Sequence, residues 1–184
     1  MTDFTLSSGS ICRPYRSPWG AFPTRSLRTE STSAAIYMGQ PVTLGTAGST
    51  NYDCATASTI AAFFNLVGIA AEAEAAGGSS AVASASISVW EANPMVEFKA
   101  VTKAGVLASS LVGLRRTLAH DSTLNIAYVD LVDSTATNWR VVITQNIDAV
   151  GDSGGYVAFR FLDRTGDQIN STILSSSPLL AFYS

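Results

Sequence analysis

The sequence predicts a mainly β protein, built as a small β-barrel or sandwich with an extended N-terminal arm and a C-terminal tail. Short runs of residues alternate between apolar and polar side chains, which is the period of a half-buried strand. Clusters of turn-forming residues separate these runs at near-regular spacing, as in small barrels and sandwiches. The chain divides into an arm at 1–35, a body at 36–164 and a tail at 165–184.

Strand patterns cover much of the body. Residues 87–91 and 96–101 alternate apolar and polar side chains, and Asn93-Pro94 between them supplies a turn. Further short strands are expected at 39–45, 124–132, 139–147 and 156–162.

Three stretches of the body are less regular. Segment 63–71 is apolar, and Gly68 in its middle favours a strand over a helix. Segment 71–86 is rich in Ala and Ser and contains a Gly-Gly pair, so a loop or a single helical turn is expected. Segment 104–118 fits either one short helix or a strand with a loop.

Composition excludes several classes of protein. The chain has 184 residues, which suits one domain, and only 14% are charged, while 24 are Ser and 18 are Thr. A net charge of −3 argues against binding to nucleic acid or anionic lipid. Two cysteines cannot build a disulfide framework or a four-cysteine zinc site. With no signal sequence and no membrane-spanning run, we expect a soluble protein made in the cytoplasm, its surface largely facing other protein.

The arm combines aromatic residues with a net positive charge. Three prolines exclude a continuous helix, and the arm carries net charge +2 against −5 for the remaining chain. Aromatic and arginine side chains are enriched at interface cores, so we expect the arm to dock on a neighbouring chain. An arm folded back on its own body, or a free terminus, stays open as an alternative. The expected contact residues are Arg13, Tyr15, Arg16, Trp19, Phe22, Arg25 and Arg28, with Leu179, Leu180, Phe182 and Tyr183 from the tail.

A serine-protease motif is present at 151–155, which reads Gly-Asp-Ser-Gly-Gly. In a chymotrypsin-like enzyme Ser153 would be the nucleophile, with His120 as general base and Asp130 or Asp133 orienting the histidine. Spacing argues against this alternative, because His120 and Ser153 are 33 residues apart and a second barrel is not expected to fit in 184 residues. A glycine-rich loop between two strands accounts for the same letters, so no enzymatic activity is expected.

Metal and cofactor sites are not expected. Asp130 and Asp133, or Glu72 and Glu74, lack the surrounding ligands of a calcium loop and read as solvated turn residues. Cys12 and Cys54 have no nearby His or Cys and read as small core or arm residues.

Part of the body resembles the decoration (cement) proteins of tailed-bacteriophage capsids. The matching segments are Met-Gly-Gln-Pro-Val-Thr-Leu at 38–44, Phe-Asn-Leu-Val-Gly-Ile-Ala-Ala at 64–71, Val-Trp-Glu-Ala-Asn-Pro-Met-Val-Glu-Phe-Lys-Ala at 89–100 and Asp-Ser-Gly-Gly-Tyr-Val-Ala-Phe-Arg-Phe at 152–161. Each segment is short, and their order covers about 38–162. The resemblance implies a small β-barrel without enzymatic activity, bound to the outer face of the capsid shell.

This resemblance sets the expected function and partners. The chain would bridge major capsid subunits on the outside of the virion and stabilise the shell, because it binds the assembled state. The resemblance also implies self-association, as a homotrimer or a dimer. The arm and the tail lie outside the matching segments, so their role in docking rests on their residues alone.

Overall fold

The computed structural model describes residues 11–29, 35–44, 53–56, 66–73, 86–133, 135 and 138–162. Nearly all of its regular structure is β, which confirms the predicted fold class. The elements in chain order are β1 (Arg13–Arg16), β2 (Thr24–Thr29), β3 (Pro41–Leu44), β4 (Asp53–Thr56), β5 (Leu66–Ala70), β6 (Ser86–Glu91), β7 (Glu97–Lys103), the 3-10 turn η2 (Ser109–Leu111), β8 (Arg115–Asp121), β9 (Ile126–Asp130), β10 (Trp139–Asn146) and β11 (Tyr156–Phe161).

Five early strands form a closed barrel, the N-terminal barrel. Its strand order is β2-β4-β3-β5-β6, and β2 closes it by pairing parallel to β4 and antiparallel to β6. Alternate residues of these strands point inward, so Leu27, Val42, Ile87 and Val89 are buried in its interior.

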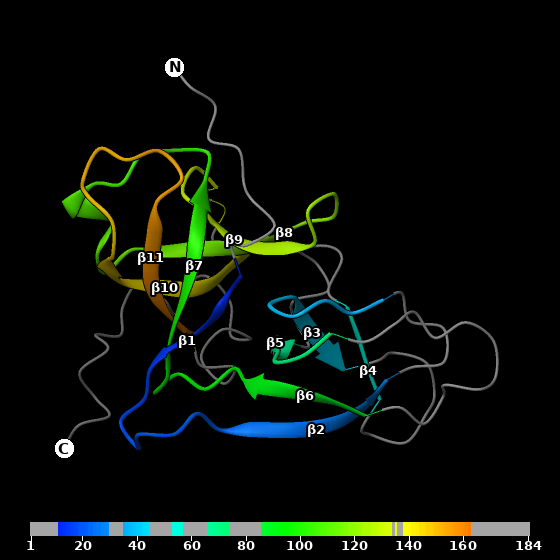
Figure 1. Ribbon diagram of the computed structural model, residues 1–184. Helices are drawn as coiled ribbons and strands as arrows, with labels where there is room; N and C mark the ends of the chain where they lie inside the picture. Colours follow the sequence, from blue (N-terminus) through cyan, green and yellow to red (C-terminus); the bar gives the residue numbers. More distant parts are fainter. Residues whose placement is uncertain are drawn as a thin grey trace.

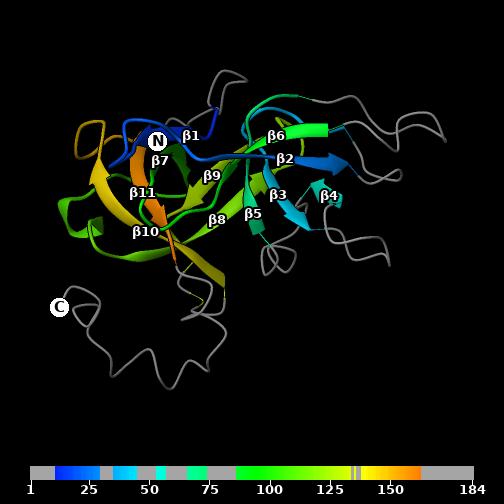
Figure 2. The same ribbon diagram turned by 90° about the horizontal axis from the view of Figure 1, so that it is seen from below.

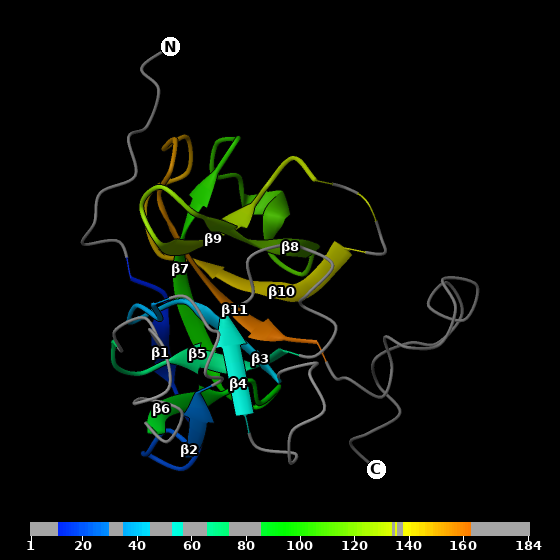
Figure 3. The ribbon, with the colours of Figure 1, turned by 90° about the vertical axis from the view of Figure 1, so that its right-hand side faces the viewer.

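The later strands form a second ring, the C-terminal barrel. Its order is β7-β11-β10-β8-β9, and it closes because β9 also pairs parallel to β7 through Val101 and Tyr128. The expectation that a second barrel would not fit in 184 residues is therefore wrong. Strands of only four to eight residues leave room for two rings, which Figure 3 shows one above the other.

One hydrophobic core runs from barrel to barrel. Phe98, Phe159 and Phe161 pack inside the C-terminal barrel, with ring centroids 4.9 to 6.0 Å apart. Leu66 and Ile69 of β5 belong to the same buried cluster although their strand lies in the N-terminal barrel. The two barrels therefore pack through apolar side chains.

The first strands join both barrels, whereas the sequence predicted an extended arm docked on a neighbouring chain. β1 pairs with β7 in the C-terminal barrel and β2 with β6 in the N-terminal barrel, as Figure 2 shows. Pro14 is tolerated because β1 pairs along only one edge. Cys12 is fully buried. The backbone of Ile11 and Cys12 passes close to Gly39, and a side chain at position 39 would collide with Ile11. The described part of 1–35 thus folds onto its own body, the alternative left open above.

The remaining sequence predictions have mixed outcomes. A strand within 63–71 is confirmed by β5, and the undecided segment 104–118 contains η2 followed by the start of β8. Most of 71–86 and all of the tail 165–184 lie outside the described residues.

A buried glutamine joins the barrels by hydrogen bonds. Gln40 is only 2% exposed, and its amide nitrogen lies 2.9 Å from Nε2 of His120 and 3.3 Å from Oδ1 of Asn125. Its side-chain oxygen accepts the backbone N–H of Tyr37 at 2.9 Å. Because the amide nitrogen can only donate, His120 Nε2 is the acceptor in this link.

Candidate docking surface

Two connections between the barrels run side by side. β1 ends opposite Glu97 and β2 begins opposite Trp90, so segment 17–23 spans the same gap as segment 92–96. The backbone N–H of Glu91 donates to the carbonyl of Pro23 at 3.0 Å, where the two segments meet. Figure 1 shows both connections at the lower left of the molecule.

These connections carry exposed apolar side chains, here called the bridge patch: Trp19, Phe22 and Met95. Trp19 is 58% exposed, Met95 40% and Phe22 37%. The backbone beneath them is held in turns, since the N–H of Trp19 donates to Ser17 Oγ and the N–H of Met95 donates to Asn93 Oδ1. Trp19 is of a residue type that is enriched among the residues contributing most to protein interfaces, so we treat these connections as a candidate docking surface.

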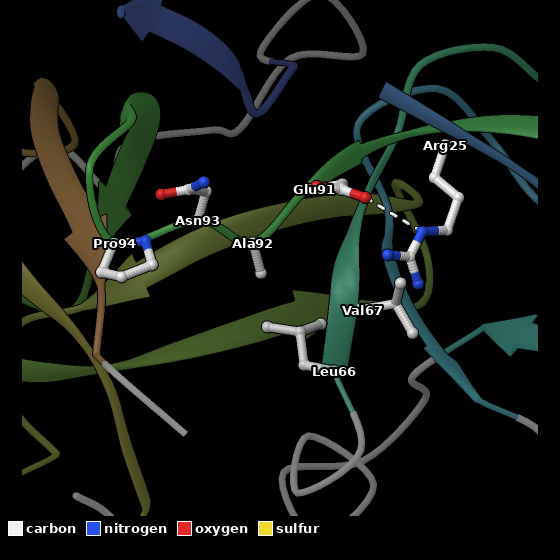
Figure 4. A pocket seen from close by; sticks show the side chains of 7 residues that line it. All are labelled: Arg25, Leu66, Val67, Glu91, Ala92, Asn93 and Pro94. Carbon is white, nitrogen blue, oxygen red and sulfur yellow. Dashed lines mark hydrogen bonds and ion pairs between the residues drawn. The ribbon is translucent and has the colours of Figure 1, made fainter. Parts of the chain in front are cut away.

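A shallow cavity of about 230 Å³ lies beside the bridge patch. Figure 4 shows an Arg25–Glu91 ion pair on its rim, with the nitrogen and oxygen 2.9 Å apart. Its other walls are mainly apolar and come from β5 and the β6–β7 turn: Leu66, Val67, Ala92, Asn93 and Pro94. With the ion pair on its rim, the cavity has a mixed polar and apolar surface, and its lining lacks the convergent polar groups that would orient a cofactor.

Next to the bridge patch, the outer face of β1, β7 and β11 is basic and aromatic. The Lys99 ammonium lies 5.9 Å from the ring centre of Tyr15 and 5.6 Å from that of Tyr156. The Arg16 guanidinium lies 4.8 Å from the Tyr15 ring centre, and Arg13 is exposed directly opposite Lys99. We call these five residues the basic face.

Glu97 is the carboxylate paired with cations on this side of the barrel. It lies 3.9 Å from Arg16 and 3.2 Å from Arg160, and its side chain is only 12% exposed. Both arginine side chains remain at least 40% exposed.

Several contact residues predicted from the sequence lie in this region. The structure brings together Arg13, Tyr15, Arg16, Trp19, Phe22 and Arg25 along the basic face, the bridge patch and the cavity rim. Arg28 pairs with Ser86 near the far end of β2, away from this region. The predicted tail contacts Leu179, Leu180, Phe182 and Tyr183 lie outside the described residues.

The sequence did not single out Lys99, Met95 or Tyr156 as docking residues. Alternation along 96–101 does place Lys99 on the outer side of its strand. The alternation cannot predict that β1 lies beside Lys99, because the pairing of β1 with β7 joins residues more than eighty positions apart.

The protease-like residues are not brought together. Ser153 lies in the loop 147–155 and pairs with Val106, which follows β7. Figure 1 shows this loop on the opposite side of the C-terminal barrel from the β8–β9 turn, which follows His120. Within the described part of the chain, no hydrogen bond joins Ser153 to His120, whose Nε2 faces Gln40. Asp133 instead accepts hydrogen bonds from Thr117 and from residues of its own turn.

The electrostatics of these groups fit structural roles. Burial lowers the pKa of His120, which favours the neutral ring that Gln40 requires. Burial would raise the pKa of Asp133, but the hydrogen bonds that its carboxylate accepts lower this pKa to about 2. Among the described residues, no three His, Cys, Asp or Glu side chains gather where they could hold a metal ion.

Comparison with known proteins identifies no relative. No protein-family model matches the chain, and no curated protein matches it. No helix within the described ranges is long and apolar enough to span a membrane.

Proposed function

We propose that this chain is a virion structural protein that binds the outer surface of a tailed-phage head and bridges major capsid subunits. The observation that carries the proposal is the bridge patch, where Trp19 and Phe22 are exposed on a connection between the two barrels. The sequence resemblance to capsid decoration proteins supplies the partner, and the charge-poor composition suits a surface covered by protein. Neighbouring copies, as a homotrimer or a dimer, would repeat the contact.

The physical basis is stabilisation of the assembled shell. A protein that binds two adjacent subunits, and not free subunits, shifts the equilibrium toward the assembled state. Repetition by symmetry gives avidity even where each contact is weak. In this proposal the chain performs no catalysis and needs no cofactor.

Binding to heads tests the proposal. We expect the double substitution Trp19→Ser and Phe22→Ser to weaken binding to heads purified from a phage deleted for this chain by about tenfold or more, since aromatic hot spots each contribute about 1 kcal/mol or more. Val132→Ser is the matched control, because Val132 is 67% exposed and lies outside the bridge patch. Equal binding by both variants, or no binding by the unaltered chain, would refute the proposal.

The protease alternative has a direct test. A fluorophosphonate probe labels an activated serine, and we expect no label at Ser153 because His120 is engaged by Gln40. Labelling of Ser153 that His120→Ala abolishes would establish the enzyme instead.

A further inference from the structure

The basic face holds two like charges directly opposite each other. Arg13 of β1 and Lys99 of β7 are antiparallel partners with side chains on the same outer face. Like charges in this arrangement destabilise a sheet. Within the described residues neither side chain lies within ion-pair distance of a carboxylate, whereas Arg16 and Glu97, the partners two positions further along β7, combine opposite charges.

The carboxylate that shares the outer face of β7 with Lys99 is already engaged. Glu97, two residues before Lys99, contacts Arg16 and Arg160. The sheet therefore holds two cations together without an anion of its own between them.

We infer that the Arg13–Lys99 pair binds carboxylate groups on an acidic protein surface of the partner. This inference names the chemistry of the partner surface and rests on the proposed function. A carboxylate between two cations removes their repulsion on binding, so the unfavourable pair in the free protein becomes a favourable contact in the complex.

Two features favour a protein carboxylate over nucleic acid. The cations are few and the chain is net negative, so the footprint for a phosphate backbone is absent from this face. Tyrosine rings lie on two sides of Lys99, and the connection that carries the bridge patch begins directly after Arg16 at the end of β1. Aromatic and arginine residues around an apolar centre are the composition of a protein interface.

The same strand offers a matched control in Lys103. Its ammonium also lies over a tyrosine ring, 5.0 Å from the centre of Tyr128, but it has its own carboxylate partner, Asp121, at 3.1 Å. The hydrogen bond to Asp121 raises the pKa of Lys103, as expected for a cation satisfied within the fold.

The test compares Lys99→Gln with Lys103→Gln in the full chain. The probe is a short poly-glutamate peptide, followed by NMR of the labelled protein, with a single-stranded oligonucleotide as the competing ligand. We expect the peptide to shift the amide signals of Arg13 and Lys99, and Lys99→Gln to weaken its binding about two- to fivefold, as for an exposed ion pair. Lys103→Gln should leave peptide binding unchanged.

Stability provides a second readout. Lys99→Gln removes the repulsion with Arg13 and should keep or raise the melting temperature, whereas Lys103→Gln breaks an ion pair and should lower it slightly. Equal effects of the two substitutions on peptide binding, or binding of the oligonucleotide in place of the peptide, would overturn the inference.

Head binding separates this inference from the proposed function. If heads bind the unaltered chain and Lys99→Gln equally well, the carboxylate contact is wrong while the capsid role stands. If the peptide binds as expected and heads do not bind at all, the capsid role fails while the carboxylate site stands.

Discussion

Acidification should loosen the junction between the barrels through the single histidine. His120 accepts a hydrogen bond from Gln40 at Nε2, and protonation of Nε2 would set an N–H against the amide N–H of Gln40. Gln40 cannot simply flip its amide, because its oxygen accepts the N–H of Tyr37. The nearby Asp121 opposes the effect of burial on this ring, but burial is the larger influence and the pKa of His120 is lowered.

The sign and size of the effect follow from proton linkage. The folded ring has a lower pKa than the unfolded one, so the unfolded chain binds more protons and stability falls as the pH drops below about 6.5. If the folded ring stayed wholly neutral, the free energy of unfolding would fall by about 2 kcal/mol between pH 7.5 and pH 5. Because His120 is only half-buried, we expect the free energy of unfolding to fall by about 1 kcal/mol over this pH range.

Urea unfolding, followed by tryptophan fluorescence at both pH values, measures this change. His120→Gln is the control, since its side-chain oxygen can accept from Gln40 but does not titrate. The chain contains one histidine, so the difference between the two proteins isolates this ring. Asp121 and Asp133 have lowered pKa values, so the stability that these two carboxylates contribute is lost only at pH values below this window. Equal losses of stability in both proteins on acidification would refute the role of the ring.

Three further predictions concern packing. Gly68→Ala should destabilise the fold by several kcal/mol, because the new methyl group would overlap the carbonyl oxygen of Trp90; circular dichroism on heating should show it, and an unchanged melting temperature would contradict the β5–β6 packing. Phe98→Ala should cost about 3 to 5 kcal/mol in urea unfolding, since its ring is fully buried; a loss below 1 kcal/mol would be inconsistent with this core. Cys12 should resist a thiol reagent at pH 8 until the protein unfolds, because burial raises its pKa; rapid native labelling would place it at the surface.

Local patterning predicted several of the strands but none of their partners. Residues 87–91 and 96–101 have a clear two-residue period, and β6 and β7 follow it closely. β1 and β2 were missed because Pro14 lies within β1 and Pro18 and Pro23 lie between the two strands. Such strands are fixed by pairing with distant neighbours. Closure of the second barrel by the parallel β7–β9 pair has no local signature at all.

The docking surface shows the same division between local and non-local information. The composition of the first thirty residues identified the aromatic and arginine side chains, since these are costly to expose without a partner. Their arrangement depends on β1 and β2 pairing with different barrels, which places Arg13 opposite Lys99 and makes segment 17–23 span the same gap as segment 92–96. No pattern within 1–35 contains that information.

If the bridge patch docks on a partner as proposed, its position between two barrels ties that docking to the integrity of the junction. Its turns are anchored at one end by β1 and β7 and at the other by β2 and β6, so a shift of one barrel against the other would distort the patch. The shared core and the buried Gln40 oppose such a shift, and a surface fixed before binding loses less entropy when it docks. A protein that makes many weak, repeated contacts benefits most from this rigidity, because the entropy saved at each contact is repeated in every copy.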